Sequence, residues 1–358
     1  MLQPGDLGSV EVNNAGLGRL LVGQRFNGHE HHGNWRLING TRSSSPYSLL
    51  EPVLRSMEVN ETKPRLSVVI ASVNGFPILG ECLDSIRRQT QVKDLEVVVV
   101  NRCAKGVGAT IKKHHPWVKL IEASTETSIP HLRAMAFRQC EGDVVAVIED
   151  HCILEPNWAG RLLEAHQTPY AAIGGVVENG ACERLVDWAH FFCEYSELMS
   201  PISEGEAEII PGNNVGYKRW VLDQFWPLIE RGVWDSTLHE QIRNAGIPLY
   251  RLPSLRVRHK MSASLWWFMS QKFHFARSFS SMRFVDANWL RRAAYGAGTA
   301  LLPLILSQRI FGRVWSIRTY RRELLLSFPI LVLLLLSWAV GEAAGYIFGP
   351  GSSHAKVA

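Results

Sequence analysis

Apolar runs alternate with amphipathic segments through the middle of the chain. Four runs are continuously apolar, as in strands that are covered on both faces. They are residues 67–73, 95–100, 118–123 and 143–148. Other segments repeat apolar residues at helical spacing: 79–86, the segment around Lys112 and Lys113, 129–140 and 158–166. The alternation predicts an α/β fold with a mostly parallel sheet, whose ligands bind beyond the carboxyl ends of the strands.

Three polar residues stand directly after the fourth run. Glu149, Asp150 and His151 follow the apolar segment 143–148 without a break. Carboxylate and imidazole groups at such a point can hold a divalent cation that bridges a diphosphate. Taken alone, the triplet is more typical of an ordinary solvated loop.

Two later residues are candidates of the same kind. Asp235 stands where a helix begins, and a carboxylate at that position also serves as a cap. His259 ends the strand-like stretch 251–259, where a single histidine is more often structural. Neither residue indicates a function when it is taken alone.

The carboxyl-terminal third is basic and contains a long apolar run. Residues 251–358 carry 15 Lys or Arg against 3 Asp or Glu. The run 324–348 is long enough to cross a bilayer, and the arginines before it predict a cytoplasmic side. We expect a transmembrane helix over 324–348, with the tail 349–358 on the far side. A buried core helix is the alternative.

The flanking regions complete the predicted domain organisation. Residues 1–64 are polar and predict a loosely structured extension, and 65–262 form the predicted α/β domain. In 263–323 aromatic residues alternate with cations, which predicts an interfacial or re-entrant segment, with a second full span as the alternative. The adjacent apolar run favours a membrane over nucleic acid as the partner of this segment.

The blocks taken together resemble a family 2 glycosyltransferase of the GT-A fold, of the membrane-anchored bacterial type, over about residues 66–283. The resemblance rests on six blocks in sequence order. They are SVVIASVNG, CLDSIRRQ with EVVVVN, LRAMAFRQCEGDVVAVIEDH, AIGGVV with GNNVGYKRWVL, WDSTLHEQIRNAG and RLPSLRVRH.

The resemblance implies a role for each candidate residue. Asp235 falls on the general base, and His151 and His259 fall on metal-ligand positions. Other positions are implied to bind the donor: Ser72, Asn74 and Asn101 at the nucleobase, Arg133 at the diphosphate, Glu149 and Asp150 in the motif that contacts the sugar-nucleotide, and Asn213 and Asn214 near the sugar and acceptor. Three residues depart from the family pattern: His151 ends an Asp-x-Asp motif that here reads Glu-Asp-His, Asn101 replaces an Asp, and Trp234 replaces an acidic residue.

The implied activity is inverting transfer of a sugar from a nucleotide-diphosphate donor, with Mn²⁺ or Mg²⁺ as cofactor. The basic aromatic segment favours a lipid-linked or saccharide acceptor at the inner membrane, a cytoplasmic catalytic domain and a role in cell-surface glycan synthesis. Two alternatives remain at this point. A nucleotidyltransferase would carry a Gly-rich basic loop after the first strand, and ASVNGFP contains no basic residue. A membrane scaffold with a decayed site is the other alternative, because the motif is altered.

Overall fold

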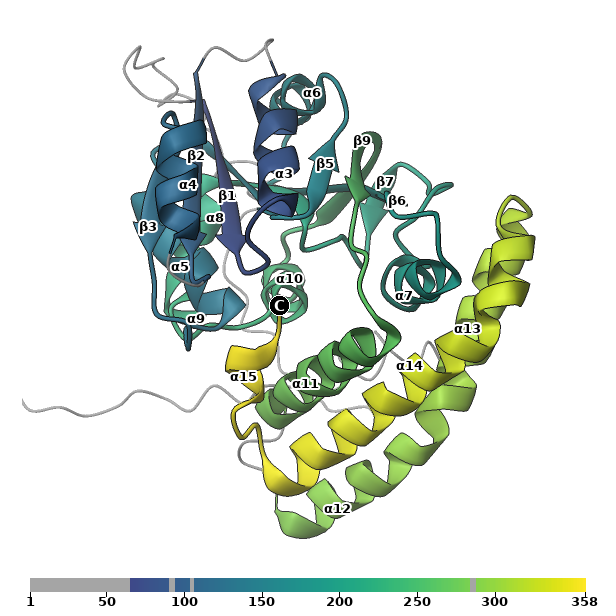
Figure 1. The fold of residues 1–358 in the computed structure, drawn as a ribbon. Helices are drawn as coiled ribbons and strands as arrows, with labels where there is room; N and C mark the ends of the chain where they lie inside the picture. Colours follow the sequence, from purple (N-terminus) through teal and green to yellow (C-terminus); the bar gives the residue numbers. More distant parts are fainter. Residues whose placement is uncertain (1–64, 90–93, 104–105, 284–287) are drawn as a thin grey trace, which may run out of the picture.

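One mixed sheet forms the centre of the protein (Figure 1). The computed structural model describes residues 65–89, 94–103, 106–283 and 288–358, and nine strands lie within them. They are β1 (Leu66–Ser72), β2 (Leu95–Asn101), β3 (Lys119–Glu122), β4 (Val144–Glu149), β5 (Cys152–Leu154), β6 (Ala172–Asn179), β7 (Gly205–Ala207), β8 (Asn214–Lys218) and β9 (Leu249–His259). The predicted extension, 1–64, lies outside the described residues.

The strand order is β3-β2-β1-β4-β8-β6-β9-β5, and β7 pairs with β9. β1, β2, β3 and β4 are parallel neighbours, β8 runs antiparallel to β4 and β6, and β6 and β9 are again parallel. Most of the described strands therefore run in one direction, as predicted for a GT-A fold. The register places Ser72 beside Asn101 and Ala71 beside Glu149, so these carboxyl ends share one edge.

Helices cover both faces of the sheet. They are α3 (Ile78–Arg87), α4 (Val107–His114), α5 (Ile129–Gln139), α6 (Trp158–Ala165), α7 (Leu185–Tyr195), α8 (Arg219–Gln224), α9 (Trp226–Ile229) and α10 (Asp235–Asn244). The apolar positions at helical spacing explain the layers. Leu79 and Leu83 of α3 are buried on one face with α4, α6 and α7, whereas Leu132 of α5 is buried on the other with α8 and α10.

Five helices follow the sheet. They are α11 (Leu265–Arg283), α12 (Trp289–Gly298), α13 (Leu302–Ile317), α14 (Arg321–Phe348) and α15 (Ser353–Lys356). α14 lies between α11 and α12 (Figure 1). In the described part of the chain it is the one helix long and apolar enough to cross a membrane, with mean hydropathy 2.4.

The first part of 263–323, which the sequence predicts to be interfacial, is α11. α11 packs against α14 on one side and lines a cavity at the carboxyl edge of the sheet on the other, so Phe268, Lys272 and Ala276 are buried. The aromatic residues of α11 that suggested a membrane surface are mostly used in this packing. Trp266 is the exception, since it is 79% exposed.

The last residues, which the sequence predicts on the far side of a membrane, contact the rest of the protein in this structure. The Arg102 guanidinium, at the end of β2, donates a hydrogen bond to the carbonyl of Val357. The backbone amide of Ala358 donates to Gln271 of α11 at 2.8 Å. The chain therefore returns from α14 to the catalytic domain, and its end lies beside α10 (Figure 1).

Candidate functional site

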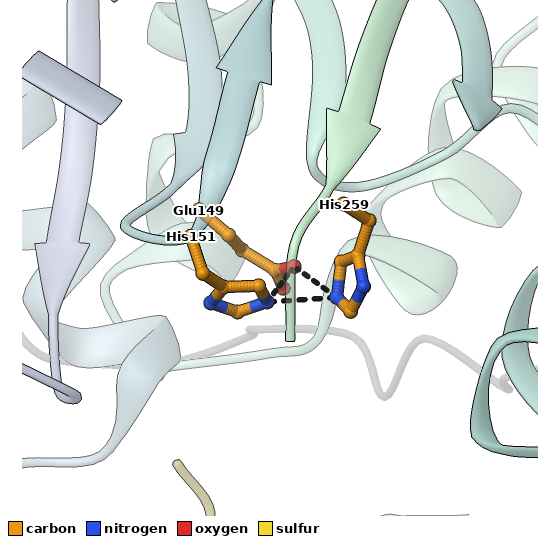
Figure 2. Close-up of side chains that lie close together, drawn as sticks. All are labelled: Glu149, His151 and His259. Carbon is orange, nitrogen blue, oxygen red and sulfur yellow. Dashed lines mark hydrogen bonds and ion pairs between the residues drawn. The ribbon is translucent and has the colours of Figure 1, made fainter. Parts of the chain in front are cut away.

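Three potential metal ligands converge below the carboxyl ends of β4 and β9. Glu149 ends β4, His151 follows in the turn before β5, and His259 ends β9 (Figure 2). Pairing of β5 with β9 sets Cys152 opposite His259 and so brings the two histidines together. Residues that are distant in the sequence thus form one group because of strand register.

The donor atoms of this group fit one divalent cation. His151 Nε2 lies 2.7 Å from His259 Nε2, and Glu149 Oε2 lies 3.4 Å and 3.8 Å from those two nitrogens. Adjacent ligands of an octahedral cation with bonds of about 2.1 Å are about 3 Å apart. The sequence placed Glu149 in contact with the donor, whereas the structure makes it the third member of the ligand group.

Asp150 positions His151. Its Oδ1 lies 2.9 Å from His151 Nδ1, so the ring proton belongs on Nδ1 and the Nε2 lone pair faces the other ligands. Burial alone would lower the pKa of His151, but the hydrogen bond with Asp150 and the charge of Glu149 raise it. Asp150 Oδ2 accepts from the amides of Val73 and Asn74, each at 2.8 Å. The sequence suggested that Asp150 contacts the donor. Because Asp150 is fully buried, its role in this structure is to position His151.

Arg133 joins the ligand group to Asp235. It lies on α5, is 5% exposed, forms an ion pair with Asp235 and lies 3.6 Å from Glu149. Burial alone would lower the pKa of Arg133, but the two carboxylates raise it. Asp235 is the first residue of α10, and its side chain is 20% exposed. The predicted base and the predicted diphosphate contact are therefore brought together.

The loop before β8 forms the floor of the site. Asn213 donates to Glu149 Oε2 at 2.9 Å and to the Tyr195 hydroxyl at 2.8 Å. A Cβ at Gly212 would lie 2.4 Å from Asp235 Oδ2, so the close approach of this backbone to the carboxylate requires glycine. Sequence reasoning missed Gly212 and Tyr195, although Gly212 begins the block GNNVGYKRWVL.

Four other predicted donor residues do not line this cavity. Asn214 is fully buried. Its side-chain nitrogen donates to the carbonyls of Val176 and Leu255, and its side-chain oxygen accepts from the Trp158 indole, so it ties β8 to its neighbours. Ser72 and Asn101 are buried side by side at the ends of β1 and β2, and Asn101 donates to Glu122 at 2.8 Å. Asn74 is used by Asp150. Ser72 and Asn101 lie on the same carboxyl edge of the sheet as Glu149, but outside the cavity.

A cavity of about 370 Å³ contains the ligand group, Arg133 and Asp235. Its size is that of a small-molecule site. One wall is apolar and comes from the carboxyl-terminal helices, through Trp267 and Phe275 of α11 and Trp338 of α14. The sequence predicted a membrane surface for Trp267 and Phe275 and a membrane span for Trp338.

A second potential ligand group overlaps the first through His259. It consists of His190, Glu194 and His259, and α7 carries the first two. The buried Lys272 ammonium forms an ion pair with Glu194. Burial alone would raise the pKa of Glu194, but Lys272 and His190 hold it at about 2. Lys272 therefore opposes a cation at this second group.

The sheet, its helical layers and a ligand group at the carboxyl edge define an α/β protein of the GT-A class. A sequence profile of glycosyl transferase family 2 matches residues 67–225. The matched segment of this chain is therefore similar to family 2 glycosyltransferases. It contains Arg133, Glu149 and His151 and ends before Asp235 and His259.

Structure comparison finds a similar fold in the mannosyltransferase PcManGT from Pyrobaculum calidifontis, solved in complex with GDP-Man and Mn²⁺. The two chains share 17% identity, the match covers 78% of this chain and 87% of the other, and the TM-score is 0.49. No match is found among curated protein sequences.

Proposed function

We propose that this glycosyltransferase is metal-dependent and inverting, and that it transfers a sugar from a nucleotide-diphosphate donor to a membrane-associated acceptor. One observation carries the proposal. Glu149, His151 and His259 converge on one side of Arg133, Asp235 lies on its other side, and all five border one cavity.

The ligand group would hold the donor end of the reaction. Glu149, His151 and His259 would hold Mn²⁺ or Mg²⁺, which would neutralise charge on the leaving diphosphate. Two imidazoles and one carboxylate are compatible with Mn²⁺. The buried guanidinium of Arg133 places a further positive charge at the same end, and Asp150 keeps the His151 lone pair directed at the group.

Asp235 would act at the acceptor end. An acceptor hydroxyl loses a proton as it attacks the sugar, and the partly exposed carboxylate of Asp235 can take that proton. Arg133 fixes the carboxylate through their ion pair, and the bare backbone of Gly212 leaves room beside it. A single displacement of this kind inverts the anomeric carbon and forms no glycosyl-enzyme.

The acceptor is proposed to be a lipid-linked saccharide or another membrane-associated glycan. The apolar wall formed by Trp267, Phe275 and Trp338 supports this choice, since it can accept the apolar part of such a molecule. The corresponding location is the inner membrane, with the catalytic domain on the cytoplasmic side and a role in cell-surface glycan synthesis.

The Asp235→Asn variant tests the proposal. With Mn²⁺ and a panel of UDP-, GDP- and TDP-sugars, we expect calorimetry to find unchanged donor affinity and turnover to fall about 100- to 10,000-fold. Product anomers read by NMR should be inverted. Full turnover in the variant would exclude Asp235 as base. Absence of donor binding in the wild type would favour the decayed scaffold.

A further inference from the structure

The outer surface of the carboxyl-terminal helices is apolar along its whole length. On α14 five of the exposed apolar residues repeat on one face, and each of these five is between 41% and 60% exposed. They are Leu326, Leu333, Leu336, Val340 and Ile347. The neighbouring segments add Trp289 and Leu290 of α12, Leu301 just before α13, and Leu304 of α13, all at least 60% exposed. We call these nine residues the apolar platform, and its extent is typical of an interaction surface.

The platform is accompanied by positive charge. Residues 288–358 contain eight Lys or Arg against two Asp or Glu. Arg291, Arg318 and Arg322 are exposed at the ends of these helices. Exposed apolar residues beside arginines suit a bilayer with anionic headgroups. A second copy of the chain would bring two basic surfaces together, which disfavours self-association there.

Both ends of α14 are attached to the catalytic domain. At its start, Tyr320 packs on Trp188 of α7, with ring centroids 5.3 Å apart. After its end, Arg277 of α11 donates to the Gly349 carbonyl at 2.9 Å, and Arg102 bonds Val357. A helix with both ends on one domain cannot carry its tail to the opposite side of a bilayer.

α14 also carries buried polar contacts that a helix surrounded by lipid would not have. Glu342 of α14 is 3% exposed and accepts hydrogen bonds from Trp338 and Tyr346, each at 2.9 Å. Its own carbonyl accepts from Ser280 of α11 at 3.0 Å. One face of α14 is therefore protein core, and only the opposite face is available to lipid.

We propose that the apolar platform docks onto the surface of one anionic phospholipid leaflet, with α14 lying in the membrane plane and no segment of 288–358 crossing it. The acceptor part of this inference rests on the proposed function. Trp338 lines the catalytic cavity from the same helix that carries the platform, so an acceptor anchored in that leaflet reaches the cavity from the side.

Vesicle flotation with the full chain tests the docking. We expect binding to phosphatidylcholine vesicles that contain phosphatidylglycerol, and weaker binding to phosphatidylcholine alone. The variant Leu336→Glu/Val340→Glu should bind at least about tenfold more weakly. The control Trp117→Glu/Trp220→Glu changes exposed aromatic residues outside the platform and should bind normally. Equal binding by both variants would overturn the proposal, as would a dimer that the first variant dissociates without any change in flotation.

Cysteine labelling tests the in-plane geometry. Cys182 is exposed on the catalytic domain, and Ser352 is exposed after α14. In sealed membrane vesicles, an impermeant maleimide should label Cys182 and the new thiol of Ser352→Cys from the same side. Labelling from opposite sides would overturn the proposal. Donor binding in detergent should be normal in every platform variant, so failure of docking is distinguishable from failure of the glycosyltransferase assignment.

Discussion

Replacement of Arg133 by methionine removes the charge between the base and the ligand group. The guanidinium is 5% exposed and has two carboxylate partners, Asp235 and Glu149. Loss of one member of a buried ion pair costs about 3–5 kcal/mol. Because the two carboxylates are 20% and 29% exposed, solvent relieves part of this cost, and we expect the low end, about 3 kcal/mol.

Thermal and urea unfolding in detergent measure this effect. A loss of about 3 kcal/mol corresponds to about 6–12 °C in Tm for a domain of this size. Arg138→Met is the matched control, because Arg138 lies on the same helix but pairs with Glu230 where both side chains are more than half exposed. It should cost less than about 1 kcal/mol. The triple variant Arg133→Met/Asp235→Asn/Glu149→Gln should recover most of the stability. Equal losses in the two single variants, or no recovery in the triple variant, would refute the reasoning.

Three further variants test other parts of the structure. Burial and Lys218 lower the pKa of His166 to about 3. The free energy of unfolding of the wild type should therefore fall by up to about 1.4 kcal/mol per pH unit because of this residue as the pH drops from 6.5 to 3. In an acid titration, His166→Leu should not show this loss of stability. Lys272→Met leaves Glu194 without its ammonium partner, so Mn²⁺ should raise Tm more in this variant than in wild type, and an equal rise would contradict the assignment. Gly212→Ala crowds the Asp235 carboxylate, so steady-state kinetics should show a lower kcat with little change in donor affinity.

The sequence predicted the sheet better than it predicted the use of individual polar residues. The runs in β1, β2 and β4 are apolar enough to be buried on both faces, so they permit few other structures. Asn213 and Asn214 are adjacent and of one type, yet their side chains differ in use. Asn213 faces the cavity, whereas Asn214 forms hydrogen bonds with residues of α6, β6 and β9. Strand register and side-chain direction decide this difference, and neither can be predicted from the spacing of nearby residues in the sequence.

The carboxyl-terminal helices show the limit of local pattern in another way. The run 324–348 satisfies length and hydropathy for a membrane span, but those criteria do not include a partner surface. α11 supplies that surface, and Gly341 and Gly345 allow its backbone to approach α14 closely. The return of Val357 to Arg102 depends on contacts between residues far apart in the chain, for which the local sequence carries no signal.

Metal dependence of nucleotide release is the most direct test of the central claim, which is that Glu149, His151 and His259 hold the cation that recruits the donor. The measurement follows free nucleoside diphosphate from UDP-, GDP- and TDP-sugars in Mn²⁺, Mg²⁺ or EDTA, with membrane lipid present. We predict release from one donor, its loss in EDTA, and an apparent metal affinity lowered more than about tenfold in His151→Ala but not in the exposed control His114→Ala. Undiminished release in EDTA, or an unchanged metal requirement in His151→Ala, would contradict the account.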